Sequence, residues 1–494
     1  MDHLLLSPDI GFLFMPLSLC AVISICLSIL FKRPNQLAAP SYSNDDRDFR
    51  KMLQDGYEKE GDQIFSIPTS NLPMYIVPPK FLNELHKLPE KTMSFRKEMY
   101  DRFLGRYTAF ASNEDSMVKS VKVDLTRSID LLLPAMMEES DYAIAESFNV
   151  SKDSWTEVPL HGVSTRLIAY LSGRSLVGLP LSRTPEWIDA AINVTLNAMA
   201  GSGKLWEYPS WSWPVVQYFL PETKGVREYF DKTAKMLAPL LKERKKQVAV
   251  PEFKAPADMT TWLVQHAKGD PWSLKYHTRQ HIVLNIAAIH TTSGQLTNTL
   301  YELAKRPEYL EPLREEIRHH AGPSAIFTKQ TLFQMKKLDS FLREVQRMNV
   351  PGLVSVNRKV LSPVTLSDGT ALPKDISLAV AADAVARDSR IWGNNASEFD
   401  GFRFERLRKT PADDNRYQFT SINEESLSFG HGRSACPGRF FAAAELKVLV
   451  SKIIMQYDMK LSDGDPGQLH GYFEVVGGPD HTRKILFKRR ATIS

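Results

Sequence analysis

The sequence predicts a mainly α-helical fold with small β-sheets, preceded by a single N-terminal transmembrane helix. Three patterns support this prediction. Helical spacing of apolar residues dominates from about residue 80 to 350, short strand-like runs occur before and after it, and residues 10–31 form an uncharged apolar stretch. The chain shows no internal repeat and no obvious break after residue 45, so we expect residues 49–494 to form one large domain.

The apolar stretch at residues 10–31 is long enough to cross a bilayer, because at ~1.5 Å per residue it spans a hydrocarbon core of roughly 30 Å. Lys32 and Arg33 follow directly, so the positive-inside rule places residues 1–9 in the lumen and the large domain in the cytosol. A cleaved signal peptide is the alternative, but the stretch is long for one and lacks preceding basic residues. Residues 32–48 are polar and are interpreted as a linker.

The predicted elements follow in order along the large domain. Two apolar runs around a polar turn predict a β-hairpin at residues 63–67 and 74–77. Periodicity predicts helices, the first with a kink or break at Pro134, over residues 128–139, 187–199, 226–243, 280–306 and 338–348. Alternating runs and an Asp-Gly turn predict strands at residues 354–360, 364–366 and 376–380.

Aromatic residues crowd the connection between two of the predicted helices. The five residues are Trp206, Tyr208, Trp211, Trp213 and Tyr218. Packing in the core explains such a cluster, and so does contact with a membrane surface or with an apolar pocket that the aromatics roof over. Both interpretations are kept at this point.

Composition narrows the classes of function. The net charge of +5, from 62 basic and 57 acidic residues, is too balanced to indicate nucleic acid as a partner. Three cysteines do not make a disulfide scaffold, and no Cys-x-x-Cys zinc spacing occurs. Cys20 and Cys26 lie within the apolar N-terminal stretch, so Cys436 is the only thiol in the rest of the sequence.

Cys436 lies at the end of a glycine-rich loop, Phe429–Arg439, that leads into an apolar helical pattern. Glycines lack a Cβ, so the backbone of the loop can pass close to a flat, bulky group. Pro437 is a favoured first residue of a helix, and a helix N-terminus would stabilise a Cys436 thiolate. These features indicate a metal ligand, and the alternative is a small cysteine buried in the core.

This loop resembles the haem-thiolate loop of the cytochrome P450 family, Phe-x-x-Gly-x-x-x-Cys-x-Gly. The resemblance covers about residues 45–494 and implies the cytochrome P450 fold, with haem b bound through Cys436 as axial thiolate. The loop residues that would contact the haem are Phe429, Gly430, Gly432, Arg433 and Gly438. The family often has a basic residue two positions before the cysteine, where this chain has Ser434; its base is Arg433, one step earlier.

The middle of the predicted helix 280–306 contains the segment Ala-Ala-Ile-His-Thr-Thr, which on its own is compatible with an ordinary helix. It resembles the family's oxygen-activation segment, Ala/Gly-Gly-x-Asp/Glu-Thr, and this implies that Thr291 is the proton-relay hydroxyl. His290 replaces the usual acid and can still relay a proton, because its unperturbed pKa is about 6.5. The segment looks like that of filamentous-fungal members acting on terpenoid and polyketide-derived metabolites.

Glu344 and Arg347 lie three residues apart on one helix face, a spacing that alone indicates a solvated surface pair. In the family such a pair is joined by an arginine from a later loop. Arg403 matches that arginine, although Gly401 and Phe402 depart from the family's Pro-Glu-Arg-Phe form. The resemblance implies a structural role for the three residues, which would hold the haem site in shape.

Arg358 lies on the predicted strand 354–360, where an ordinary exposed arginine is the simple interpretation. The resemblance implies instead that its planar guanidinium binds a haem propionate. The departure at Ser434 places more of the propionate contact on Arg358.

The resemblance implies monooxygenation, in which O₂, two electrons and two protons are consumed. No Gly-x-Gly-x-x-Gly fingerprint occurs, so we expect electrons from a separate NADPH-cytochrome P450 reductase. Candidate cations for its docking surface are Lys336, Lys337, Arg433 and Arg439. Together with the predicted anchor, this implies a single-pass protein of the endoplasmic reticulum membrane with a cytosolic catalytic domain.

The implied substrate is an apolar small molecule of terpenoid or polyketide type. Family topology suggests a pocket lined by Ile289, Val350, Leu353, Val354 and residues 473–476. Alternatives within enzymes are rearrangement, desaturation, ring expansion or a peroxide isomerase, and a membrane-tethered haem-binding protein without turnover is the alternative outside them.

Overall fold

The computed structural model describes residues 36–70, 72–111, 115–322, 324–465, 467 and 470–490. The predicted lumenal segment 1–9 and anchor 10–31 lie outside these residues, as does the start of the predicted linker. Within the described ranges, no helix combines the length and the apolar character needed to span a membrane. The described linker residues lead into helix α2 (Phe49–Glu60), whose first turn is capped by Asp48.

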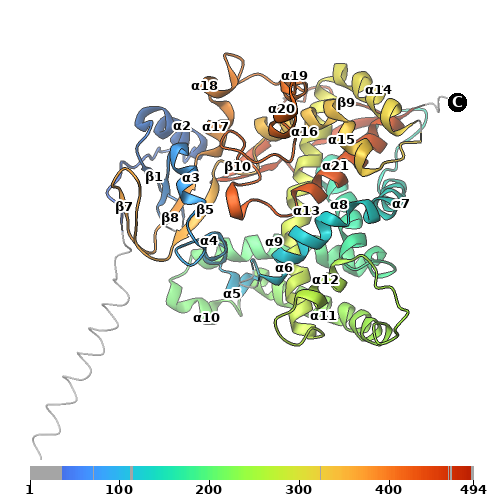
Figure 1. Cartoon of the computed structure of the whole chain (residues 1–494), viewed down its shortest axis with the longest axis horizontal. Coiled ribbons are helices and arrows are strands. Elements are labelled where there is room, and N and C mark those ends of the chain that lie inside the picture. Colours follow the sequence, from blue (N-terminus) through green and yellow to red (C-terminus); the bar gives the residue numbers. More distant parts are fainter. Residues whose placement is uncertain are drawn as a thin grey trace, which may run out of the picture.

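A long central helix, α13 (Leu274–Lys305), organises the helical part of the molecule (Figure 1). It is buried along most of its length and packs against α8 (Leu160–Leu176), α9 (Pro185–Trp206), α11 (Pro221–Gln247) and α21 (Arg439–Gln456). Predicted helices 187–199, 226–243 and 280–306 are therefore present. The first two extend beyond the predicted bounds at both ends, and the third begins earlier than predicted, at Leu274, and ends at Lys305. Leu296, Leu300 and Leu303 of α13 have no exposed surface and belong to the main apolar core.

Fourteen further helices complete the helical part described by the structure. They are α3 (Leu82–Leu85), α4 (Phe95–Arg102), α5 (Gly105–Thr108), α6 (Ser116–Lys119), α7 (Ile129–Ser147), α10 (Trp213–Val216), α12 (Met259–His266), α14 (Leu310–Ala321), α15 (Lys329–Gln334), α16 (Lys336–Met348), α17 (Ala382–Arg387), α18 (Ser389–Trp392), α19 (Arg403–Leu407) and α20 (Pro411–Arg416). The predicted break at Pro134 is wrong, because α7 continues through it. Pro134 and Asp130 are exposed, so the Asp130 carbonyl that loses its amide partner can be hydrated.

A five-stranded sheet forms the smaller part of the molecule, with α2 and α3 beside it in Figure 1. Its order is β1 (Phe65–Ile67), β2 (Met74–Ile76), β8 (Ser377–Val380), β5 (Ser355–Val360) and β3 (Met93–Ser94), and only the β2–β8 pair among these is parallel. The predicted hairpin is confirmed, with Phe65 opposite Ile76. The predicted strands 354–360 and 376–380 are confirmed as β5 and β8.

Three small sheets accompany it. They are the pair β6 (Val364–Thr365) and β7 (Ala371–Leu372), the set β4 (Thr156–Pro159), β12 (Lys484–Arg489) and β9 (Tyr457–Leu461), and the hairpin β10 (His470–Phe473) and β11 (Val476–Pro479). The β10–β11 hairpin pairs locally, with Phe473 opposite Val476 across a two-residue turn. Val476 of β11 forms a bridge with Gly352, just before β5, and β11 packs against α13.

Candidate active site

The Cys436 loop is held in a compact turn before α21. The Cys436 N–H donates to the Phe429 carbonyl at 2.7 Å, and the Gly430 N–H donates to the Leu427 carbonyl at 2.8 Å. Gly430 and Gly432 adopt positive φ values of 74° and 64°, which favour glycine. A Cβ on Gly432 would also lie 2.5 Å from the Cβ of His86. The loop therefore requires its glycines for conformation and for space.

The helix after the loop begins two residues later than predicted. Residue Arg439 is the first residue of α21 and Gly438 is its N-cap, so Pro437 precedes the helix. The Arg439 guanidinium donates to the carbonyls of Cys436 at 2.8 Å and Thr420 at 3.1 Å. These bonds hold the cysteine backbone against the start of α21, and they turn the half-buried Arg439 inward.

The Cys436 thiol is partly buried. Burial raises the pKa of the Cys436 thiol, although the N–H groups of Gly438 and Arg439 and the Arg439 guanidinium lower it. The predicted stabilisation of a thiolate by the helix N-terminus is thus outweighed by burial in the protein alone. Coordination to a metal cation would favour the thiolate form of Cys436.

The middle of α13 is accessible over a short stretch of an otherwise buried helix. Ala287 and Thr291, one turn apart, are exposed and Ala288 is partly exposed. The Thr291 hydroxyl donates to the Ala287 carbonyl at 2.8 Å, as its position in the helix suggested. Ile289 points the other way and is fully buried in the core. The small alanines and the threonine therefore form the face of α13 that a bound group can approach.

His290 does not share the environment of Thr291. Its Nε2 lies 2.9 Å from the Ile192 carbonyl of α9, so Nε2 carries the hydrogen and donates it. Burial lowers the pKa of His290, and the nearby His481 acts in the same direction. The imidazole is therefore neutral at pH 7, and Nδ1 is the atom at which it can accept a proton.

The structure brings Glu344, Arg347 and Arg403 together as a buried cluster. Arg347 binds the Glu344 carboxylate through two hydrogen bonds of 2.8 and 2.7 Å, and Arg403 Nε reaches the same carboxylate at 3.3 Å. The Asp400 N–H adds a bond of 2.9 Å to Glu344. Because the Glu344 side chain has no exposed surface, the solvated-pair interpretation is wrong for it.

The two arginines of this cluster also bind the chain around them. Arg347 donates to the carbonyls of Ala386 and Ala396 at 2.7 and 2.6 Å, and both Arg347 and Arg403 donate to the Glu398 carbonyl at 3.1 Å. The cluster thus fixes α16 against α17 and against the segment that follows α18. Its role in this structure is to hold the chain that leads toward the cysteine loop.

Arg358 on β5 is buried rather than exposed, against the simple expectation for a strand arginine. Within the described residues its guanidinium makes one hydrogen bond, a 2.8 Å bond from Nη1 to the Asn357 carbonyl. Burial lowers the pKa of Arg358 to about 10, so the group stays charged at neutral pH. A buried cation with donors to spare fits an anionic partner such as a carboxylate.

His431, which sequence reasoning did not select, lies close to Arg358. Burial, then the neighbouring His86 and the positive charge of Arg358, lower the pKa of His431. Its ring packs edge-on against His86 at 5.7 Å between centroids. Its Nδ1 is buried without a hydrogen-bond partner among the described residues. His431 Nδ1 and the Arg358 guanidinium are buried polar groups with hydrogen-bonding capacity left over, which the carboxylate groups of a haem would satisfy. The residues present therefore fit haem b.

The other predicted residues fall into two groups. Arg433 is exposed, and Lys336 and Lys337 are partly exposed, so these three are available to a protein partner. Lys336 forms an ion pair of 3.2 Å with Asp414. Val350 and Leu353 of the predicted pocket are buried in the described structure, whereas Phe473 at the end of β10 is 80% exposed.

Comparisons with known proteins agree with this geometry. The family model for cytochrome P450 matches residues 185–479. Cytochrome P450 monooxygenase BOA4 of Botryotinia fuckeliana (strain B05.10) is 39% identical over 450 residues, which cover 90% of both chains. Cytochrome P450 monooxygenase braC of Annulohypoxylon truncatum is 35% identical over 444 residues, covering 89% of this chain and 88% of braC.

A third fungal relative covers the same part of the chain. Cytochrome P450 monooxygenase gliF of Aspergillus fumigatus is 33% identical over 455 residues, which cover 90% of both chains. Members of this family bind haem b through an axial cysteine thiolate and use it to activate oxygen. With a family match over more than half its length and relatives aligned over nearly all of it, this chain belongs to the cytochrome P450 family and is a haem-dependent monooxygenase.

Proposed function

We propose that this protein oxidises an apolar small molecule, a fungal secondary metabolite of terpenoid or polyketide origin, with Cys436 as the axial haem ligand. The observation that carries the assignment of the ligand is the Cys436 loop, whose glycines, positive φ values and backbone bonds present one thiol in a rigid turn. The substrate class is supported by the fungal source of the relatives and by the Ala-Ala-Ile-His-Thr-Thr form of α13.

The haem would be held by Cys436, the glycine loop and Arg358, and when bound it supplies the activation of O₂. Thr291 and His290 act on protons. The Thr291 hydroxyl is anchored to the Ala287 carbonyl on the accessible face of α13, where it can pass a proton from its own oxygen. The His290 Nε2–H donates to the Ile192 carbonyl, so Nδ1 is the atom at which His290 takes part in proton transfer.

Electrons come, in this proposal, from NADPH-cytochrome P450 reductase. The surface that supports docking contains the exposed Arg433 and the partly exposed Lys336 and Lys337. Arg439, the fourth predicted cation, is partly exposed, and its guanidinium also donates to two backbone carbonyls. Charge complementarity at such a surface speeds encounter with an acidic partner and weakens with added salt.

The proposed location is the endoplasmic reticulum membrane, with residues 10–31 as a single-pass anchor and the catalytic domain in the cytosol. A second feature supports membrane contact. In the segment between α9 and α11, Trp211 is 70% exposed, Val215 62% and Phe219 80%. Aromatic side chains exposed to this degree suit a membrane interface better than a core. A chain lacking residues 1–31 should still bind vesicles, and should lose this binding in a Trp211→Ser/Phe219→Ser variant.

The function is tested by expressing the protein with a reductase in a fungal host that is fed candidate metabolites, followed by mass spectrometry of the products. Reduced protein with carbon monoxide should give the thiolate-specific Soret shift, and the shift should vanish in Cys436→Ala. Turnover without NADPH, O₂ and reductase would contradict monooxygenation. A normal shift without oxidation of any metabolite would favour a haem-binding protein without turnover.

A further inference from the structure

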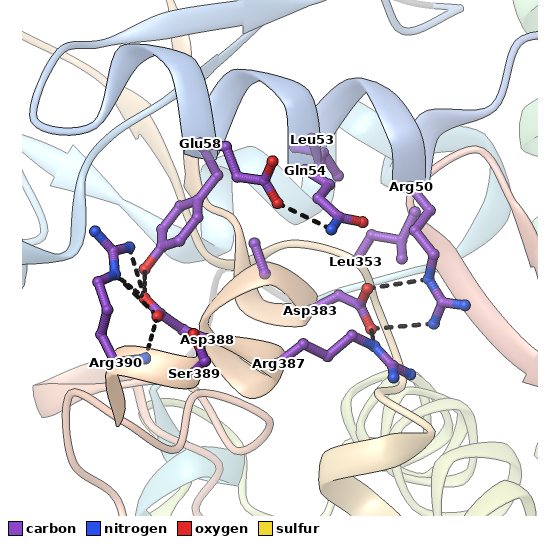
Figure 2. A pocket seen from close by; sticks show the side chains of 12 residues that line it. Arg50, Leu53, Gln54, Glu58, Leu353, Asp383, Arg387, Asp388, Ser389 and Arg390 are labelled. Carbon is purple, nitrogen blue, oxygen red and sulfur yellow. Dashed lines mark hydrogen bonds and ion pairs between the residues drawn. The ribbon is translucent and has the colours of Figure 1, made fainter. Parts of the chain in front are cut away.

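A cleft of about 340 Å³ lies between α2 and the pair α17–α18, and charged side chains line it (Figure 2). These side chains form two separate groups. In one, Arg390 binds Asp388, which also accepts a 2.9 Å bond from the Tyr57 hydroxyl. In the other, Arg50 and Arg387 both bind Asp383. Only the second group, among the described residues of the cleft, continues to the β10–β11 hairpin.

Arg50 connects α2 to that hairpin. Its Nε and Nη2 bind the two Asp383 oxygens at 3.0 and 3.1 Å, a bidentate pair that fixes the plane of the guanidinium. Nη2 also donates to the Tyr472 hydroxyl at 2.7 Å, and the guanidinium carbon lies 4.5 Å from the centre of the Tyr472 ring. Tyr472 of β10 is therefore held by a hydrogen bond and by a cation–π contact to one charged group.

Asp383 connects the same network to the segment that follows α16. Its side chain is buried and accepts from Arg387 Nε at 3.2 Å, and Arg387 Nη2 donates to the Met348 carbonyl at 2.7 Å. The Asp383 N–H donates to the Leu353 carbonyl at 3.1 Å. The buried carboxylate thus ties together α2, the end of α16 and the segment 350–354.

The hairpin rests on this segment by backbone hydrogen bonds. The Leu353 N–H donates to the Val475 carbonyl at 2.8 Å, and the Gly477 N–H donates to the Pro351 carbonyl at 3.0 Å. Gly352 lies between them, and a Cβ there would be 3.2 Å from the Val475 carbonyl oxygen. A side chain there would need the hairpin to move away by a few tenths of an ångström, so the segment and the hairpin are in close contact at Gly352.

The two ends of the hairpin are also fixed. At the turn, Glu474 accepts a 2.9 Å bond from the Ser70 N–H in the connection between β1 and β2. At the other end, Pro479 would lie 3.6 Å from a Cβ built on Gly294 of α13, three residues after Thr291. The hairpin therefore bridges the five-stranded sheet and the part of α13 that carries the proposed relay hydroxyl.

Alternation along β10 separates its side chains. Tyr472 faces Arg50, so its neighbour Phe473 projects from the opposite face of the strand, where it is 80% exposed. A two-stranded hairpin is marginally stable alone and needs contacts from outside to keep one position. Arg50 and Asp383 supply such contacts on the Tyr472 face and leave the Phe473 face free.

From these contacts we infer that Arg50, Asp383 and Tyr472 are positioning residues that fix the β10–β11 hairpin as a wall of the substrate cavity and so limit the size of the substrate. The inference rests on the proposed function, because it assumes an apolar substrate beside Thr291. None of the three residues need touch the substrate, since they act through the hairpin and the segment 350–354.

The test uses the full-length haem protein and the variants Arg50→Met and Tyr472→Phe. In Arg50→Met the buried Asp383 carboxylate still has a charged partner, because Arg387 remains paired with it. Arg390→Met is the matched control, because it removes an arginine from the same cleft whose partners, Asp388 and Tyr57, do not contact the hairpin. Hydrogen exchange of backbone amides in residues 471–479 should speed up about tenfold in both test variants, the effect of losing one charged hydrogen bond, and stay unchanged in Arg390→Met.

The second readout is ligand size. The dissociation constants of imidazole and of the bulkier 1-(triphenylmethyl)imidazole are measured from the Soret shift. The Kd of the bulkier ligand divided by the Kd of imidazole should fall about fivefold in both variants. Unchanged hairpin exchange would overturn the positioning role, and faster exchange with an unchanged or higher ratio would overturn the size limit. A missing carbon monoxide Soret shift in the wild type would instead sink the proposed function, while the exchange data still decide the role of Arg50.

Discussion

Glu445 on α21 gives the most quantitative prediction. The carboxyl is fully buried between α21 and α8, and its one hydrogen bond in the described structure is from the Ser172 hydroxyl at 2.8 Å. Burial raises the pKa of Glu445 from 4.5 to about 8, and the bond from Ser172 opposes this shift. The group is therefore protonated in the folded protein at pH 7 and ionised in the unfolded chain. The perturbation is Glu445→Gln, a neutral side chain of the same shape.

The sign of the effect follows from proton binding. Below pH 4.5 the Glu445 carboxyl is protonated in both the folded and the unfolded protein, and its contribution to the free energy of unfolding is complete. This contribution is lost as the pH rises through about 8, because ionisation favours the unfolded state. At about 1.4 kcal/mol per pKa unit, the loss from pH 4.5 to pH 7 is about 3 kcal/mol. Gln cannot ionise, so the free energy of unfolding of the variant should gain about 3 kcal/mol relative to the wild type over that interval.

The assay is urea unfolding of both proteins, followed by tryptophan fluorescence at several pH values between 5 and 8. Glu228→Gln, at an exposed position on α11, is the control and should leave the difference from the wild type independent of pH. The reasoning fails if the Glu445→Gln and wild-type curves run parallel over the whole range. It also fails if the variant loses stability relative to the wild type as the pH rises.

Four further predictions concern the haem site. Glu344→Gln leaves two buried guanidinium groups without their carboxylate, so it should lower the free energy of unfolding by about 3 kcal/mol and reduce haem content, measured by urea unfolding and by the Soret-to-protein absorbance ratio. Arg358→Met should speed haem transfer to apomyoglobin about tenfold without abolishing the carbon monoxide shift, and an unchanged rate would argue against a propionate contact. Thr291→Ala should raise the hydrogen peroxide formed per NADPH while leaving the carbon monoxide shift intact, and full coupling to product would contradict the relay. Gly432→Ala forces a side chain into a positive φ and against His86, so purified protein should contain little haem, whereas Gly178→Ala, also at positive φ but in open space, should be loaded normally.

Sequence patterns predicted those parts of the fold and site that depend on short-range spacing. The β1–β2 hairpin, the central helix and the Cys436 loop each carry their signal within a few residues, and each is present. The Glu344–Arg347 pair was also visible as a spacing, but its burial was not. A helix surface and a helix interface can present the same i, i+3 pair, and only the packing of Arg403 and the chain around it distinguishes them.

Other features left no local signal. More than three hundred positions separate Arg50 from Asp383, and about ninety separate Asp383 from Tyr472. No window of sequence therefore shows that these residues meet. The burial of Glu445 was hidden for a related reason, since a charged residue in a helical pattern is normally solvated. Pro134 misled in the opposite direction. It lies inside α7, yet the helix continues, because the Asp130 carbonyl that loses its amide partner is at an exposed position where water can bind it.

The departure of Gly401 from the family form has a steric cause that also explains why the arginine cluster survives it. A Cβ at Gly401 would lie 2.6 Å from the Phe341 ring and 2.7 Å from the Tyr309 ring, so this chain has filled the space with aromatic side chains from elsewhere. The Tyr309 hydroxyl accepts from the Gly401 N–H at 3.1 Å, and Ser340 donates to the Gly401 carbonyl at 2.9 Å. These bonds hold the turn before Arg403, and its Nε still reaches Glu344. Gly401 therefore lets this turn pack against Phe341 and Tyr309 while Arg403 reaches the buried carboxylate of Glu344.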